Sequence, residues 1–122
     1  MTKAMMILIA GPYRSGTGDD PALMAANLTR LEAAALPLFE KGHVPMIGEW
    51  VALPIWRVAG GESVGDALYD KILHPAAGRL LQHCDAVLRL AGASKGADND
   101  VAIARARAIP VYFSLDEIPA AA

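Results

Sequence analysis

The chain has 122 residues, a net charge of −2, a hydrophobic fraction of 54% and one cysteine. This length suits one domain over residues 1–122, and the lack of a basic excess argues against nucleic-acid binding driven by charge. The lone Cys84 excludes an internal disulfide and is typical of a reducing compartment. The apolar run Ala4 to Ala10 is too short to span a bilayer and lacks the flanks of a signal peptide, so we expect a cytoplasmic protein without membrane partners.

The first part of the chain predicts a strand, a loop, a helix and a second strand. Met6 to Ala10 is a continuous apolar run, which is typical of a strand buried on both faces of a parallel sheet. A loop rich in Gly and Ser follows as far as Asp20, a good N-cap with a proline directly after it. Apolar residues at alternating steps of four and three then indicate a helix to about Lys41, kinked or loosened by one turn at Pro37. His43 to Ile47 is expected to form the second strand.

The rest of the chain predicts a long loop, further helices and two more strands. Residues 48–61 hold two Trp, one Pro and three Gly without a clear period, so we expect a long loop with room for a turn of helix. Glu62 to Leu73 and Pro75 to His83 are expected to form two helical pieces broken at Pro75. Asp85 to Leu90 should form a strand, and Ala91 to Gly96 a Gly/Ser loop. A helix over Ala97 to Ala108 and a strand over Ile109 to Ser114 follow.

Strands that alternate with helices imply parallel pairing and right-handed crossovers. We therefore predict a three-layer α/β fold of the Rossmann or flavodoxin type. Its sheet should have four or five parallel strands, with the first and third as neighbours and with helices on both faces. Ligands of such sheets bind beyond the carboxyl ends of the strands, where the strand order reverses. The loops after the first and third strands lie at that edge and are expected to form one site.

The loop after the first strand has the chemistry of an anion site. Glycines let backbone N–H groups turn toward an anion, and Arg14 adds a forked cationic donor, so a phosphate or a carboxylate would fit. The alternative is a flexible loop with an exposed Arg. The loop matches neither a dinucleotide fingerprint nor a Walker A loop. The candidate binding residues here are Gly11, Pro12, Tyr13, Arg14, Ser15 and Gly16.

The loop after the third strand places polar residues at a predicted helix start. Ser94 and Gly96 lie just before the helix, where backbone N–H groups are free. Asp98 and Asp100 fall in its predicted first turn. They either favour the helix dipole alone, or one of them serves as a nucleophile or as a hydrogen-bond partner of a sugar.

The segments MILIAGPYR and DAVLRLAGASKGADNDVAIARA together resemble the nucleoside 2-deoxyribosyltransferase superfamily, which includes 2′-deoxynucleoside 5′-phosphate N-hydrolases. The resemblance runs from Met6 to about Phe113. It implies that the Arg14 loop and Ser94 hold the substrate, often by its 5′-phosphate, and that Asp100 stands at the position of the catalytic Glu. The carboxylate would attack the anomeric carbon as the base leaves, and water or a second base would resolve the glycosyl-enzyme, as in retaining glycosidases.

Three departures from the family pattern bear on activity. Asp100 is one methylene shorter than Glu, so its carboxylate reaches roughly 1.5 Å less, and a misplacement of about 1 Å can cost on the order of 100-fold in rate. Relatives carry an Asp eight residues before the Asp that opens the third strand, and Ala77 stands there in this chain. Asp66 and Asp70 are candidates to replace that acid. Leu8 occupies a position where relatives with transferase activity often have Tyr.

Other residues at the same edge have two interpretations. Trp50 and Trp56, which lie near Glu49 after the second strand, either stack on a nucleobase or pack in the core or against a second subunit. We include Trp50 among the candidate binding residues. Arg89 lies in a strand that should be buried and therefore needs a carboxylate or a phosphate, with Asp98 or a partner subunit as candidates. The histidines lack metal-ligand spacing, so we expect no metal and no cofactor.

The sequence thus predicts an enzyme that cleaves or transfers at the N-glycosidic bond of a nucleoside or nucleoside 5′-monophosphate. The first alternative is a non-catalytic nucleotide-binding or sensor module on the same scaffold, and the second is a structural oligomer without a ligand. We expect a homodimer or a higher homo-oligomer, because a chain this short gives its helices little depth of core and its Trp-bearing loop offers apolar surface. The resemblance implies the same.

Overall fold

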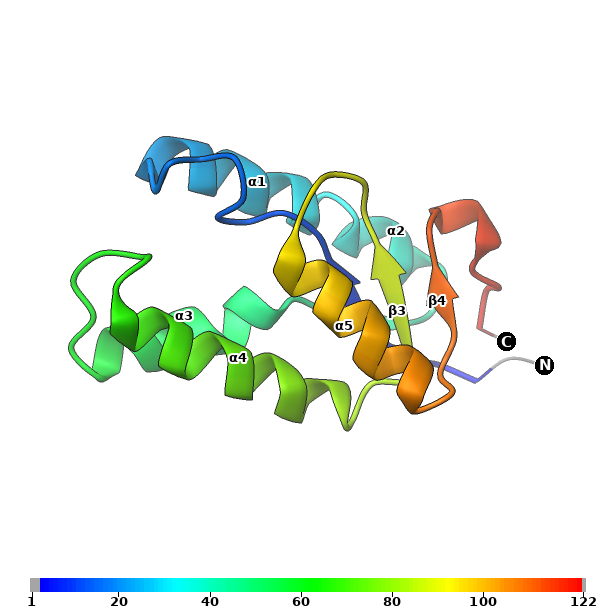
Figure 1. The fold of residues 1–122 in the computed structure, drawn as a ribbon. Coiled ribbons are helices and arrows are strands. Elements are labelled where there is room, and N and C mark those ends of the chain that lie inside the picture. Colours follow the sequence, from blue (N-terminus) through cyan, green and yellow to red (C-terminus); the bar gives the residue numbers. More distant parts are fainter. Residues whose placement is uncertain (1–2, 122) are drawn as a thin grey trace.

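The computed structural model describes residues 3–121, whose fold is shown in Figure 1. Its strands form one all-parallel sheet in the order β2-β1-β3-β4, with bounds β1 Met6–Ala10, β2 Val44–Met46, β3 Ala86–Arg89 and β4 Val111–Tyr112. In the register, Leu8 of β1 pairs with Met46 on one side and with Val87 on the other. The prediction that the first and third strands are neighbours is confirmed. Because the chain leaves β1 toward β2 and then crosses back to β3, the strand order reverses between β1 and β3.

Helices cover both faces of this sheet, which confirms the predicted three-layer α/β architecture. Ile7 and Ile9 of β1 pack with the helices of one face, whereas Leu8 and Ala10 pack with those of the other, as the two-residue period of a strand requires. Within residues 3–121, none of the helices is both long enough and apolar enough to cross a membrane. The helices are α1 (Pro21–Glu32) and α2 (Ala35–Glu40) on the first face, α4 (Ala67–Leu81) and α5 (Lys95–Ala106) on the second, α3 (Gly48–Val58) packed against α4, and a 3-10 turn η1 (Leu115–Glu117).

The helix expected from Pro21 to about Lys41 is divided into α1 and α2. The interruption lies at Ala33 and Ala34, before Pro37 rather than at it. Pro37 has no N–H to offer the carbonyl of Ala33, and its ring crowds that carbonyl. The prediction of one loosened turn is therefore confirmed: it falls just before Pro37, where Ala33 and Ala34 keep helical backbone angles.

The prediction of a long loop over residues 48–61 is wrong, because α3 occupies most of that segment. Its buried residues, Gly48, Ala52 and Trp56, recur every four positions and mark one helix face. Two of the three are small, and other apolar residues lie around the rest of the helix. A helical hydrophobic period is nevertheless present in the segment, and the prediction missed it.

The prediction of two helical pieces broken at Pro75 is also wrong. A single helix, α4, runs through Pro75, and it starts only after Asp66, whose carboxylate caps it by accepting from the Tyr69 N–H at 2.8 Å. Pro75 and Lys71 are both exposed, so the missing hydrogen bond falls on the solvent side of the helix. The ends of β2, β3, β4 and α5 differ from the predicted ends by one or two residues.

Candidate functional site

A cavity of about 190 Å³ lies at the carboxyl ends of β1 and β3, where the strand order reverses. Its walls come from the end of β1 and the loop after it, the start of α3, one face of α4 and the first turns of α5. The structure brings most of the predicted site residues together in this cavity. Those that line it are Gly11, Tyr13, Arg14, Ser15, Ser94, Gly96 and Asp100.

Three predicted binding residues lie outside the cavity lining. The Trp50 indole is at the surface and donates its Nε1–H to the Glu32 carboxylate at 2.7 Å, on the side of α1. Gly16 is exposed, and nothing lies within 4 Å of the place where its Cβ would be. Pro12 packs against Gly92, where a Cβ would come within 2.7 Å of the proline ring. Pro12 therefore joins the loops after β1 and β3 rather than facing the cavity.

Asp98 also lies outside the lining, because it serves as the partner of Arg89. The Arg89 Nη2 donates to the Asp98 carboxylate at 2.9 Å, and the Arg89 side chain is only 10% exposed. The same guanidinium donates to the carbonyls of Leu90 and Gly92. This confirms the expectation that Arg89 needs a carboxylate, and it gives Asp98 a role in fixing the loop after β3.

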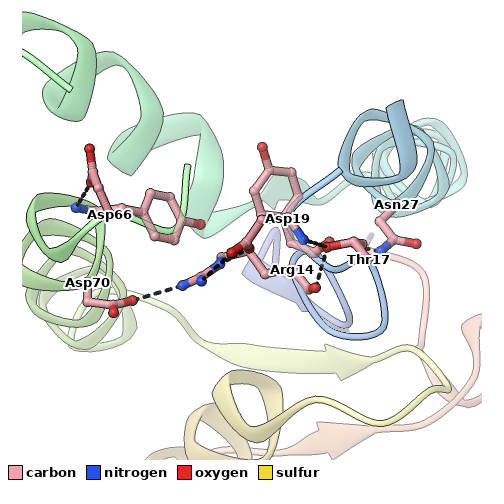
Figure 2. A network of polar contacts seen from close by, with 8 residues as sticks. Arg14, Thr17, Asp19, Asn27, Asp66 and Asp70 are labelled. Atoms are coloured by element: carbon pink, nitrogen blue, oxygen red, sulfur yellow. Dashed lines mark hydrogen bonds and ion pairs between the residues drawn. The ribbon is translucent and has the colours of Figure 1, made fainter. Parts of the chain in front are cut away.

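The loop after β1 is held by its own hydrogen bonds and by α1 (Figure 2). The buried Thr17 hydroxyl donates to the Arg14 carbonyl at 2.6 Å and accepts from the Asp19 N–H at 3.2 Å. Asn27 of α1 donates its side-chain amide to the Tyr13 carbonyl at 2.8 Å. These bonds fix the direction in which Tyr13 and Arg14 leave the loop.

The Arg14 guanidinium lies between two carboxylates, Asp19 and Asp70 (Figure 2). Its Nε donates to Asp19 at 3.0 Å, and its Nη1 donates to Asp70 of α4 at 3.1 Å. Its Cζ also lies 5.5 Å from the centroid of the Tyr69 ring, which is within cation–π range. The forked donor that the sequence offers to a phosphate is thus engaged by acidic side chains of the same chain.

Asp100 is a partly buried carboxyl group on α5. The Ser94 hydroxyl caps α5 by accepting from the Ala97 N–H at 3.1 Å, so the helix starts at Lys95 and Asp100 falls in its second turn, not in the first turn as predicted. Burial raises the pKa of Asp100 to about 7, the charge of Glu49 adds to the rise, and Arg89 opposes it. Near neutral pH this carboxyl therefore exchanges readily between its acid and its ionised form.

Glu49 provides a second carboxyl group in the same cavity. It lies in the first turn of α3 and is half-buried, and none of the ion pairs within residues 3–121 involves it. Burial raises the pKa of Glu49 as well. The charge of Glu49 also contributes to the raised pKa of Asp100, because two ionised carboxylates in one cavity repel each other.

Tyr69 is a cavity residue that the sequence analysis did not identify. The side chain is fully buried, and among the residues that the structure describes its hydroxyl has no hydrogen-bond partner. Trp56 packs edge-on against the Tyr69 ring with the centroids 6.3 Å apart, so Trp56 belongs to the core. The spacing of Tyr69, Leu73 and Ala77 along one helix face is the signal that could have shown this wall of the cavity.

The position of the missing acid, Ala77, does lie in the cavity wall. Of the two candidates to replace it, Asp66 accepts hydrogen bonds from the Trp56 indole and the Tyr69 N–H and does not line the cavity. Asp70 lines the cavity but is paired with Arg14. Glu49 is thus the carboxyl group beside Asp100 that no cation neutralises in the described part of the chain.

In comparisons with known proteins, no family model, no curated protein and no solved structure matches this chain. Across residues 3–121, no three His, Cys, Asp or Glu side chains gather in a way that could hold a metal ion.

Proposed function

We propose that the cavity binds a nucleoside or a nucleoside 5′-monophosphate and that the chain cleaves or transfers at the N-glycosidic bond through Asp100. The observation that carries the proposal is the pair of partly buried carboxyls, Asp100 and Glu49, in one cavity at the switch point of the sheet. The resemblance of the loops after β1 and β3 to the nucleoside 2-deoxyribosyltransferase superfamily supports the choice of substrate.

In the first step the ionised Asp100 attacks the anomeric carbon of the sugar. The carbon–nitrogen bond breaks with its electron pair passing to the base, and a glycosyl ester forms on Asp100. The positive charge that develops on the sugar in the transition state is stabilised by the Asp100 carboxylate.

Glu49 supplies the proton in this step. The leaving base needs a proton on the nitrogen that receives the electron pair, and a carboxyl group in its protonated form can give it. Burial raises the pKa of Glu49 in that direction. Glu49 thereby takes over the role of the acid that Ala77 cannot perform.

The second step returns the enzyme to its starting state. The Glu49 carboxylate, now without its proton, accepts a proton from a water molecule as that water attacks the sugar carbon, and Asp100 leaves as a carboxylate. A second base in place of water gives transfer instead of hydrolysis.

Assembly of two or more copies is part of the proposal. Exposed apolar side chains on α3, namely Ile55 and Val58, support it, because Val58 is 90% exposed and such groups favour burial against a partner. Light scattering at micromolar concentration tests it: a homodimer or a larger assembly is expected, and a monomer contradicts it.

The direct test of activity is release of free base from a panel of ribonucleosides, 2′-deoxynucleosides and their 5′-monophosphates, followed by chromatography. The wild type should release base from at least one member, and Asp100→Asn should reduce the rate by on the order of 10⁴-fold. Asp116→Asn, which removes the same charge from an exposed position in η1, is the matched control. Equal rates in wild type and Asp100→Asn, or no release from any substrate, would make the binding-module alternative the better account.

A further inference from the structure

The charged groups of the cavity are mostly acidic. Arg14 is the one Lys or Arg among its lining residues, against the carboxyl groups of Glu49, Asp70 and Asp100. A 5′-monophosphate carries a charge of about −1.5 to −2 at pH 7. It would therefore enter a site that already has more acidic than basic side chains.

Arg14, the one Lys or Arg of the cavity lining within residues 3–121, is already engaged by two carboxylates. Asp19 engages both Nε and Nη2 of Arg14, at 3.0 and 3.4 Å, which is the edge that binds a phosphate or carboxylate in a bidentate manner. Asp70 engages Nη1 at 3.1 Å, and the face of the guanidinium lies over the Tyr69 ring. Figure 2 shows Arg14 held between the two carboxylates. A phosphate would have to displace one of them and then remain close to it.

The glycines of the loop after β1 do not form an anion cradle either. A Cβ on Gly11 would come within 2.8 Å of Leu31, so this glycine permits close packing of the loop on α1. Gly16 and Gly18 have positive φ angles and open space around them, and neither lines the cavity. They serve the turn that brings Asp19 back to Arg14.

Uncharged polar side chains also belong to the cavity walls. The buried Tyr69 hydroxyl lacks a partner within the described residues, and Ser15, Ser94 and Asn99 also line the walls. A buried hydroxyl without a partner is costly, and a ligand hydroxyl that reaches it removes that cost.

We propose that the site selects an uncharged nucleoside with a free 5′-hydroxyl and rejects the 5′-monophosphate, because Asp19 and Asp70 occupy Arg14. This inference rests on the proposed function and narrows its substrate class. Asp70 acts as a specificity determinant: it withholds the one lining Arg from anionic ligands and adds a repelling charge.

The test compares equilibrium binding of each 2′-deoxynucleoside with that of its own 5′-monophosphate by calorimetry, at constant ionic strength. For at least one nucleoside, the affinity for the wild type should be about tenfold or more higher than the affinity of its monophosphate. Asp70→Asn should raise monophosphate affinity and reduce that ratio about tenfold or more, since it removes a negative charge and replaces the ion pair at Nη1 of Arg14 by a weaker neutral hydrogen bond. Asp116→Asn should leave the ratio unchanged.

The inference is overturned if the monophosphate binds the wild type as tightly as the nucleoside, if Asp70→Asn leaves the ratio as it was, or if no pair member binds. Base release, measured separately, tells this failure from that of the proposed function. If nucleosides bind preferentially but no free base is released, the inferred selectivity stands and the proposed catalysis fails. If free base is released from monophosphates in preference to nucleosides, the proposed catalysis stands and the inferred selectivity fails.

Discussion

Arg14 Nη1 lies 3.1 Å from the Asp70 carboxylate, and this ion pair joins the loop after β1 to helix α4 beside the cavity. The two residues are 56 positions apart in the sequence. The pair is partly exposed, with the Arg14 and Asp70 side chains 31% and 52% accessible. Its effect should therefore be local rather than global, because solvent screens such pairs.

Arg14→Ala should loosen the loop without unfolding the protein. The free energy of unfolding should change by less than about 1 kcal/mol. Hydrogen exchange of the Thr17 and Asp20 amides, which donate within the loop, should become faster. Arg105→Ala, at an exposed position on α5, is the control and should change neither. Unchanged exchange at Thr17 in Arg14→Ala would show that the ion pairs do not hold the loop.

Asp100→Asn should stabilise the fold at high pH only. The pKa of Asp100 in the folded protein is about 7, above its ordinary value of 3.8, so the folded state keeps a proton that the unfolded state loses between these values. Stability therefore falls as the pH rises through this window and levels off above it. The variant removes that loss, which is on the order of a few kcal/mol.

Urea unfolding of wild type and Asp100→Asn at pH 4 and pH 8 checks this expectation. The difference between the two proteins should be small at pH 4 and clearly in favour of the variant at pH 8. Asp116→Asn provides the comparison for loss of an exposed carboxylate. A difference that is the same at both pH values would mean that Asp100 titrates normally.

Glu49→Gln should lower the pKa of Asp100. The Glu49 charge is the second cause of the raised value, after burial, so its removal should bring the pKa below 7 but not to 3.8. Titration of the side-chain carboxyl carbon by NMR measures this directly. Glu40→Gln, at an exposed position at the end of α2, should leave the titration unchanged. An unaltered Asp100 pKa in Glu49→Gln would separate the two carboxyls and remove the basis for their joint role.

The sheet and the position of the site could be predicted from the sequence because their signals are local. The apolar run Met6 to Ala10 corresponds to β1 at both ends, because a strand that is buried on both faces is apolar at every position and is visible in its own sequence. Ser94 was identified near a helix start because a capping hydroxyl lies beside the N–H groups that it satisfies. Of the strand order, the prediction covers only the adjacency of β1 and β3, which is confirmed.

The features that were missed depend on contacts between distant segments. Helix α3 is stabilised by burial of Trp56 against Tyr69, and neither residue reveals the other in the sequence. The engagement of Arg14 by Asp70 is equally hidden, because the two residues lie 56 positions apart in the sequence. Glu49 reaches the cavity only because α3 begins directly after β2.

Tyr69→Phe should separate binding from stability. Since the hydroxyl has no partner within residues 3–121, its removal should leave the free energy of unfolding unchanged or raise it by up to about 1 kcal/mol. Affinity for a nucleoside should fall about tenfold, which reports a lost hydrogen bond to the ligand. Tyr112→Phe in β4 is the control for loss of a tyrosine hydroxyl elsewhere. A stability loss above about 1 kcal/mol would show that the Tyr69 hydroxyl is bonded within the folded chain.

The most direct test of the account is to detect the glycosyl ester on Asp100. Wild-type protein and a nucleoside that it cleaves are mixed, quenched in acid within a turnover, and analysed by intact-protein and peptide mass spectrometry. We predict an added mass equal to one sugar residue, located on Asp100 and absent from Asp100→Asn. Base release without any adduct, or an adduct that persists in Asp100→Asn, would contradict the assignment of Asp100 as the nucleophile.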